Sequence, residues 1–256
     1  MITLKSDREI ELMRIAGHIT ELAHQAVEKA IRPGISTYEL DKIAYDVITS
    51  NNATPSFLNY NGFPATICAS INEVVIHGIP SKKTILKDGD IISIDIGANY
   101  HGYHGDCAKT FFVGSVSEEK KKLVEVTTQS LYEGLKFARP GNRLSDISHA
   151  IEEYATKFGY SMVLDYTGHG VGHALHEDPA VPNYGAPGRG PILKKGMTLA
   201  IEPMVNMGTH RVKVLKDNWT VVTQDKMPSA HYEHSIVITD DGYEILTKIK
   251  GEEIDV

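Results

Sequence analysis

The stretch ILKDGDIISID (Ile85–Asp95) occurs a second time in the chain, as ILKKGMTLAIE (Ile192–Glu202). A shorter pair, AIRPG (Ala30–Gly34) and FARPG (Phe137–Gly141), is separated by the same 107 positions. Two matches at one fixed offset indicate an internal duplication. We therefore expect residues 1–256 to form a single domain made of two halves, roughly 1–115 and 116–256.

Each half has the same plan of two helices. Ser6-Asp7-Arg8-Glu9 has the form of a capping box, which predicts a helix over 6–30, and its counterpart is predicted over 117–138. Apolar residues at helical spacing predict a second helix over 37–50 in the first half and over 144–158 in the second.

Apolar strands follow the helices in each half. The predicted strands are ATICAS (65–70), DIISIDI (90–96) and CAKTFFV (107–113), then MTLAIEPMV (197–205) and HSIVIT (234–239). Helices followed by antiparallel-looking strands indicate an α+β protein. Two such halves, related by a pseudo-twofold axis, would share one central antiparallel-type sheet flanked by helices.

Composition excludes several classes of protein. The net charge is −7, which argues against specificity for nucleic acid, because phosphate binding needs a basic face. The sequence has neither a signal-peptide pattern nor 18 consecutive apolar residues, so we expect no membrane span. The two cysteines, Cys68 and Cys107, have no paired spacing. A disulfide framework is therefore not expected, and the expected compartment is the reducing cytoplasm. We also expect a monomer, because no pattern in the sequence demands a partner.

Two acids occupy equivalent places in the repeat. Asp95 lies between Ile94 and Ile96, where a buried carboxylate costs several kcal/mol unless something compensates its charge. At the common offset it aligns with Glu202. An edge position or an arginine partner would also explain Asp95 alone, and Glu202 could simply end a strand before its proline.

A second pair of acids is less regular. Asp106 in HGDCAKTFFV and Glu233 in HYEHSIVIT each precede or open an apolar run. They correspond only if the second half carries about twenty extra residues, which we place over 206–226.

Four inward carboxylates would repel one another unless cations compensate them. His169 lies between two glycines, which predict a tight loop open to a cation or substrate. One imidazole with four carboxylates suits Mn, Fe, Co or Zn, and two ions roughly 3.5–4 Å apart activate water for hydrolysis in aminopeptidases. Taken singly, His169 could belong to an ordinary loop and His77 to a surface loop. We interpret His173 and His234 as structural.

Five motifs, in this order and spacing, resemble those of the type I methionine aminopeptidases, metallopeptidases of the pita-bread fold. They are INEVVIHGIP (71–80), IDIGANYHGYHGD (94–106), TGHGVGHALHEDP (167–179), LAIEPM (199–204) and YEHSIVIT (232–239). The resemblance covers nearly the entire chain, and its fold agrees with the duplication.

The resemblance implies two divalent metal ions held by five ligands. Asp106 and Glu233 would bridge both ions. Asp95 would complete the first site, and His169 with Glu202 the second. The ions would bind the free amine of the substrate and activate water for attack on the scissile carbonyl.

The resemblance also implies catalytic roles and an apolar slot for methionine. Glu202 would transfer a proton. His176 would hydrogen-bond the substrate and the tetrahedral oxyanion, and His77 would contact the substrate near the scissile amide.

The slot would be lined by Tyr60, Phe63, Cys68, Leu175 and Trp219, whose rings and sulfur suit a thioether. Phe63 stands where the family commonly has tyrosine, and Leu175 where it commonly has phenylalanine. These departures alter the expected shape of the slot but keep it apolar. Both residues would also fit an ordinary core.

The implied activity is removal of the initiator methionine from nascent chains when the second residue is small, with transient contact to the ribosome. Lys120, Lys121 and Lys122 form a short basic run, which we interpret as a solvated helix face. The enzymatic alternative is a proline-directed peptidase of the same fold, such as prolidase or aminopeptidase P, which usually carries an extra N-terminal domain. Type II methionine aminopeptidases carry a large insertion that is absent here. The third alternative is a non-catalytic binding protein, but such relatives tend to lose metal ligands.

Overall fold

The computed structural model describes residues 1–249 of the chain. Within them, four long helices are arranged as two pairs. Ser6 and Ser36 cap the first pair through complete capping boxes with Glu9 and Glu39, and Ser117 caps α3. The helices are α1 (Asp7–Ala30), α2 (Thr37–Ser50), α3 (Glu118–Leu135) and α4 (Leu144–Thr156), with one 3₁₀ turn, η1 (Tyr60–Gly62).

All four predicted helices are confirmed to within about three residues at their ends. The strands agree less closely. The predicted strand over 197–205 is broken in two at Glu202-Pro203, because proline cannot continue the hydrogen-bond ladder. The described strands are β1 (Thr54–Pro55), β2 (Ile67–Ile71), β3 (Val74–Ile76), β4 (Ile91–Tyr100), β5 (Tyr103–Phe112), β6 (Ser161–Met162), β7 (Gly168–Gly170), β8 (Glu177–Val181), β9 (Thr198–Ile201), β10 (Met204–Asn206), β11 (Val212–Val214), β12 (Val221–Thr223), β13 (Ser229–His231), β14 (His234–Ile238) and β15 (Tyr243–Ile245).

The strands of residues 1–249 pair antiparallel throughout, which confirms the α+β class. They form four sheets. The larger sheet of the first half has the order β1-β4-β2, with β5 also paired to β4, and the larger sheet of the second half has the order β15-β14-β9-β7-β8. The two smaller sheets are β13-β10-β6 and β11-β12-β3.

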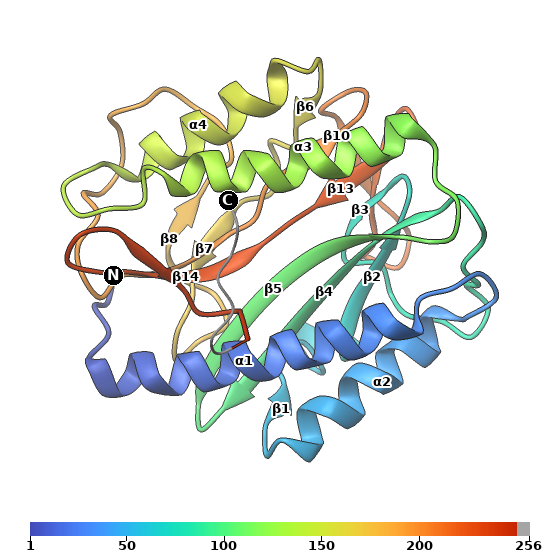
Figure 1. Cartoon of the computed structure of the whole chain (residues 1–256), viewed down its shortest axis with the longest axis horizontal. Helices are drawn as coiled ribbons and strands as arrows, with labels where there is room; N and C mark the ends of the chain where they lie inside the picture. Colours follow the sequence, from blue (N-terminus) through green and yellow to red (C-terminus); the bar gives the residue numbers. More distant parts are fainter. Residues whose placement is uncertain (250–256) are drawn as a thin grey trace.

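The two helix pairs lie on the same side of these sheets, α1 and α2 over the first half and α3 and α4 over the second (Figure 1). Alternate residues of β4, among them Ile92, Ile94 and Ile96, are fully buried against α1 and α2. The residues between them therefore face the opposite side of the sheet.

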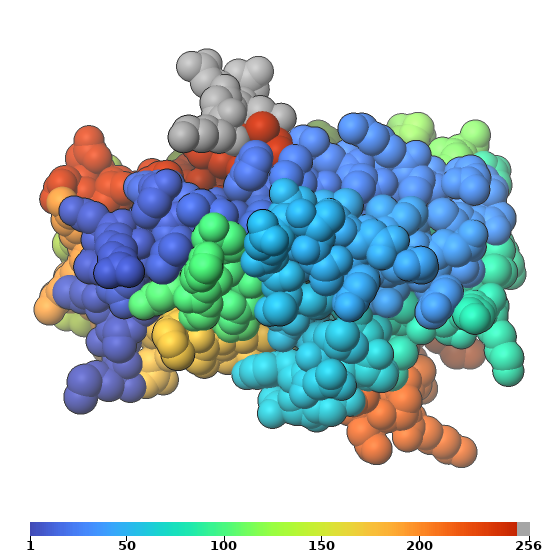
Figure 2. Space-filling model, turned by 90° about the horizontal axis from the view of Figure 1, so that it is seen from below, coloured from blue at the N-terminus to red at the C-terminus, as the bar shows by residue number. Residues whose placement is uncertain are grey.

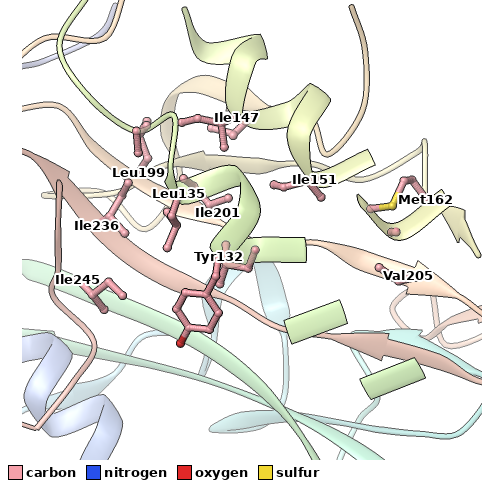
Figure 3. Packing of buried hydrophobic residues seen from close by; sticks show 14 of the residues in the cluster. Tyr132, Leu135, Ile147, Ile151, Met162, Leu199, Ile201, Val205, Ile236 and Ile245 are labelled. Carbon is pink, nitrogen blue, oxygen red and sulfur yellow. The ribbon is translucent and has the colours of Figure 1, made fainter. Parts of the chain in front are cut away.

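The core of the second half is built in the same way. Figure 3 shows Leu135 of α3 and Ile147 and Ile151 of α4 gathered over Leu199 of β9 and Ile236 of β14. This apolar layer fixes the positions of β9 and β14. It therefore also fixes Glu202, which follows β9, and Glu233, which precedes β14.

The two halves meet along a seam between β5 and β14, which lie side by side near the centre of the molecule (Figure 1). Helix α1 lies directly on this seam. A Cβ atom added to Gly105 would lie 2.5 Å from the backbone of Gly17, so the close approach of α1 to β5 depends on Gly105. A Cβ atom at Gly17 would instead lie 2.3 Å from the carbonyl oxygen of Leu246.

The helix-to-strand connections repeat at the offset found in the sequence. An isolated antiparallel bridge joins Ser36 to Ile85, and another joins Arg143 to Ile192, each 107 positions further on. The single-domain prediction covered 1–256, and its last residues, 250–256, lie outside the described residues.

The predicted insertion forms a hairpin. β11 and β12 pair with each other, and β12 also pairs with β3 of the first half. The hairpin region, orange in Figure 2, projects from the body of the molecule. Within residues 1–249, no helix is both long enough and apolar enough to cross a membrane.

Candidate metal centre

A cavity of about 390 Å³ opens on the side of the sheets away from the helices. All twelve site residues predicted from the sequence line it. They are Tyr60, Phe63, Cys68, His77, Asp95, Asp106, His169, Leu175, His176, Glu202, Trp219 and Glu233. The cavity is also lined by Phe57, Asn61, Ile76, Tyr166 and Thr167, which the sequence did not single out.

Strands β4 and β5 bring the first two acids together. Asp95 lies opposite Cys68 of β2 on one side and Ala108 of β5 on the other, and Asp106 lies opposite Gly97. The strand alternation that buries Ile94 and Ile96 under the helices points Asp95 into the cavity. Asp95 is therefore neither on an edge strand nor next to an arginine.

Strands β7 and β9 position the next two groups. His169 of β7 pairs with Ala200 of β9, two residues before Glu202. Nε2 of His169 lies 3.6 Å from Oε1 of Glu202 and 3.7 Å from Oδ2 of Asp106. Asn183 donates a hydrogen bond to the backbone carbonyl of Glu202, which holds the break before Pro203.

The fourth acid is held by the seam. The backbone N–H of Glu233 donates to the carbonyl of Ala108 at 2.8 Å, and the Cys107 thiol donates to the Glu233 carbonyl at 3.0 Å. The buried Ser235 hydroxyl accepts from the N–H of Asp106 at 3.0 Å and donates to its carbonyl at 2.8 Å. One acid from each half is therefore fixed relative to the other.

The carboxylates of this cavity lack compensating charge. Burial raises the pKa of Asp95, Asp106, Glu202 and Glu233 above the usual range of carboxylic acids, and repulsion from neighbouring carboxylates raises that of Asp95, Glu202 and Glu233 further. One oxygen each of Asp95, Asp106 and Glu233 is buried without a hydrogen-bond partner. Unpaired buried oxygens of this kind are what a divalent cation would satisfy, so the donor set fits a metal centre.

The imidazole of His169 is oriented to bind a cation together with these carboxylates. Its Nδ1 bonds to the carbonyl of Gly170 at 2.9 Å, so Nδ1 carries the proton and Nε2 presents a lone pair to the carboxylates. Burial lowers the pKa of His169 to about 3, which keeps the ring neutral. Asp106, His169 and Glu233 each offer a ligand atom within 4.8 Å of the others.

The prediction of a tight loop at His169 is wrong. Gly168 and Gly170 belong to β7, between β8 and β9. A Cβ atom at Gly168 would lie 2.4 Å from the carbonyl oxygen of Ala200, and one at Gly170 2.2 Å from that of Asp178. The glycines therefore allow three strands to pack closely around the histidine.

Two further histidines face the cavity. Nδ1 of His176 bonds to the Tyr60 hydroxyl at 2.8 Å, and its ring centroid lies 4.2 Å from that of His169. His77 has a φ of 58°, in the left-handed region that non-glycine residues rarely adopt. Burial lowers the pKa of His176, and it lowers that of His77 to about 4, so both rings are neutral at physiological pH.

An apolar slot adjoins the carboxylates. The buried side chains of Phe63, Cys68 and Leu175 form it together with Phe57. Trp219, at the end of the projecting hairpin, packs edge-on to Phe63 with the ring centroids 5.2 Å apart. The inserted segment of the second half thus closes a slot that is otherwise made mainly by the first half.

One histidine next to the centre was missed by sequence reasoning. His231 is 1% exposed, and its Nε2 lies 3.3 Å from Oε2 of Glu202. Its spacing of two from Glu233, in the extended run before the apolar strand, was the signal that could have found it, because such residues share a face. Burial lowers the pKa of His231 to about 3.

The lysine run on α3 is occupied by contacts within the chain. Lys120 donates to Asn72 and to the carbonyl of Gly89, while Lys121 and Lys122 pair with Glu118 and Glu125. His234, read as structural, contacts Thr247 and Tyr132 on the helix side of β14.

Comparisons with known proteins agree with this geometry. A model of metallopeptidase family M24 matches residues 11–240. The chain is 57% identical to "Methionine aminopeptidase 1" of Bacillus subtilis over 97% of its own length and 100% of that protein. It superposes on the crystal structure of methionine aminopeptidase from Thermotoga maritima with a TM-score of 0.96 and 47% identity, covering 97% of this chain and 100% of that one.

A more distant structure shares the fold. The prolidase from Pyrococcus furiosus is matched with a TM-score of 0.79 and 26% identity, over 96% of this chain and 65% of the prolidase. The pita-bread fold expected from the sequence is thereby confirmed.

Proposed function

The chain belongs to metallopeptidase family M24, and on that premise we propose that it is a metal-dependent aminopeptidase that removes an N-terminal methionine from peptides. The observation that carries the proposal is the single cavity in which four carboxylates and His169 adjoin a closed apolar slot. The high identity to methionine aminopeptidases, against 26% to a prolidase, favours methionine release over cleavage before proline.

Five residues would hold two divalent ions: Asp95, Asp106, His169, Glu202 and Glu233. Asp106 and Glu233 would serve both ions, Asp95 the first and His169 with Glu202 the second. The mixture of oxygen donors with imidazole suits Mn, Fe, Co or Zn. When bound, such ions supply a Lewis acid for the scissile carbonyl and an activated water.

Glu202 is suited to move the proton. Its carboxylate is partly accessible from the cavity, with its side chain 13% exposed, and burial raises its pKa, which makes the ionised form a stronger base than an exposed carboxylate. It would accept a proton as the water attacks and deliver it to the departing amide nitrogen, which balances the hydrolysis of the peptide bond.

The neutral histidines act by hydrogen bonding. If the Tyr60 hydroxyl donates to Nδ1 of His176, the proton of that ring is on Nε2, where it can be donated to the developing oxyanion. His77, held in a strained backbone conformation, would contact the substrate near the scissile amide.

Methionine specificity would come from the slot. Phe63, Cys68, Leu175 and Trp219 offer apolar surface and sulfur to a thioether, and Tyr60 closes it on the His176 side. The substrate's small second residue would lie outside the slot, toward the mouth of the cavity.

We further propose that the two halves, roughly 1–115 and 116–256, form one catalytic domain that arose by duplication and acts as a monomer. The matched bridges at an offset of 107 support the duplication. The proposed substrates are nascent polypeptides in the cytoplasm, with transient contact to the ribosome. The buried, unpaired thiols of Cys68 and Cys107 suit a reducing compartment.

A peptide panel tests the function. The metal-loaded protein is incubated with Met-Ala-Ser, N-acetyl-Met-Ala-Ser and Ala-Pro-Ala, and free amino acids are measured by mass spectrometry. We expect methionine from the first peptide alone, because the acetyl group blocks the free amine. Alanine release from Ala-Pro-Ala without methionine release would assign the chain to the proline-directed enzymes.

A further inference from the structure

His231 lies directly behind the carboxylates, although it does not line the cavity. Its backbone is fixed by Thr110 of β5, whose hydroxyl donates to the His231 carbonyl at 2.8 Å and accepts from its N–H at 3.1 Å. Because side chains alternate in extended chain, His231 and Glu233 point to the cavity side, while Tyr232 and His234 point toward the helices.

The imidazole is buried without a hydrogen-bond partner for Nε2. The side chain is 2% exposed, and Nε2 is 3.3 Å from Oε2 of Glu202 in a geometry that is not that of a hydrogen bond. A histidine retained only for packing normally has its buried ring nitrogens satisfied. Here the unsatisfied nitrogen points at the carboxylates.

Glu202 therefore lies between two imidazoles. Its Oε1 is 3.6 Å from Nε2 of His169 and its Oε2 is 3.3 Å from Nε2 of His231. Glu202, His231 and Glu233 each offer a ligand atom within 4.8 Å of the others, which makes them a second three-residue group beside Asp106, His169 and Glu233.

We propose that His231 is a sixth protein ligand of the metal centre and binds, through Nε2, the ion that Glu202 and Glu233 hold. The inference rests on the proposed metallopeptidase function, since it assumes that the carboxylates bind metal. With His169 and His231 both present, the centre has two imidazole donors. Such a set favours Fe, Co or Zn over Mn more strongly than a set with one imidazole does.

The test counts imidazoles on the metal by proton NMR of the cobalt(II)-loaded protein. A histidine that binds cobalt through Nε2 keeps its proton on Nδ1, and that proton gives a strongly shifted signal that disappears in heavy water. We expect two such signals from the wild type, one from His169 and one from His231. The His231→Gln variant should retain one signal. In a titration of the metal-free variant, the affinity for the ion held by Glu202 and Glu233 should be at least roughly tenfold lower than in the wild type.

A single imidazole signal in the wild type, or two signals that persist in His231→Gln, would overturn the proposal and leave His231 as a positioning residue for Glu202. His234→Gln is the matched control, because His234 is a buried histidine three positions on that faces the helices, and it should keep both signals. His231→Asn repeats the count if the glutamine variant fails to fold. Absence of cobalt binding altogether would instead contradict the proposed function.

Discussion

Three structural features distinguish Glu202 from the other carboxylates of the cavity. It follows β9 immediately before a proline, its backbone carbonyl is held by Asn183, and its two oxygens face different histidines. Its charge is unfavourable in the metal-free protein, since burial and Asp106 both raise its pKa. A bound cation would remove that penalty and leave the carboxylate ready for proton transfer.

Replacement of Glu202 by glutamine tests this role. Glutamine keeps the shape but cannot accept a proton, so we expect kcat/KM on Met-Ala-Ser to fall by roughly 10²–10⁴-fold. Urea unfolding of the metal-free variant should show a free energy of unfolding equal to or above that of the wild type, because glutamine carries no buried charge. Glu244→Gln, which alters a carboxylate paired with Arg14 outside the cavity, is the control and should remain active. Near-normal turnover of Glu202→Gln would remove it from the reaction.

Trp219 is expected to act on the substrate and not on the metal. Loss of its ring in Trp219→Ala removes apolar contact of about 1.5–3 kcal/mol, which corresponds to a fall of roughly 10–100-fold in kcat/KM for methionyl peptides. Metal content, measured by plasma mass spectrometry, should stay the same, and Trp219→Phe should restore most of the activity. A parallel loss of metal would show that the ring supports the centre itself.

At the residue scale the sequence was informative where a residue type conflicts with its surroundings. Asp95 among isoleucines could be recognised because a buried charge needs compensation. His231 carried only a weak signal, its spacing of two from Glu233, since a single histidine in an extended segment conflicts with nothing until the position of Glu202 in space is known.

At the scale of the elements, the β5–β14 seam sets the geometry of the centre. Asp106 and Glu233 come from different halves, and the Ser235 hydroxyl ties the backbone of the first to the strand of the second. The fold therefore holds its central acids by hydrogen bonds between sheets and not by neighbouring turns.

Ser235→Ala should lower the free energy of unfolding by about 1–3 kcal/mol, because two buried backbone groups of Asp106 lose their partner. Ser148→Ala is the matched control. Ser148 is equally buried in α4 but its hydroxyl has no partner, so its removal should leave stability unchanged or raised. Urea denaturation of the metal-free proteins measures both, and equal effects of the two substitutions would contradict a special role for the seam.

Helices were predictable because their signals are local. Ser6 with Glu9 marks the start of α1, and apolar spacing marks α2 and α4. Strands were harder. β5 begins at Tyr103, inside a polar and glycine-rich stretch, because its pairing with β4 outweighs its composition. β7 was mistaken for a loop because the close packing that needs its glycines involves strands distant in the sequence.

At the scale of the whole molecule, the duplication explains why acids meet at the centre. Each half ends its repeated apolar run in an acid, and the seam brings the runs together. The pairing of β12 with β3 could not be predicted, since the insertion has no counterpart in the first half.

Metal binding should depend on pH in a defined direction. In the metal-free protein, burial raises the pKa of Asp106 to about 7, and Asp95, Glu202 and Glu233 are also raised. A cation binds the ionised carboxylates, so it must displace protons, and affinity should fall as pH decreases below about 7.

Calorimetry between about pH 6 and pH 8, in buffers of different ionisation enthalpy, measures both the affinity and the protons released. His169, with its pKa lowered to about 3, should contribute nothing in this range. An affinity independent of pH, with no proton release, would mean that the carboxylates are already ionised before metal arrives.

If this cavity is a divalent-metal centre that releases N-terminal methionine, activity must depend on bound metal. Metal-stripped protein is assayed on Met-Ala-Ser before and after separate addition of Mn, Fe, Co and Zn, with bound metal counted in the same samples. We expect no methionine without metal and release that rises with the number of ions bound. Full release from the stripped protein, or none with any metal from a folded and metal-loaded sample, would contradict it.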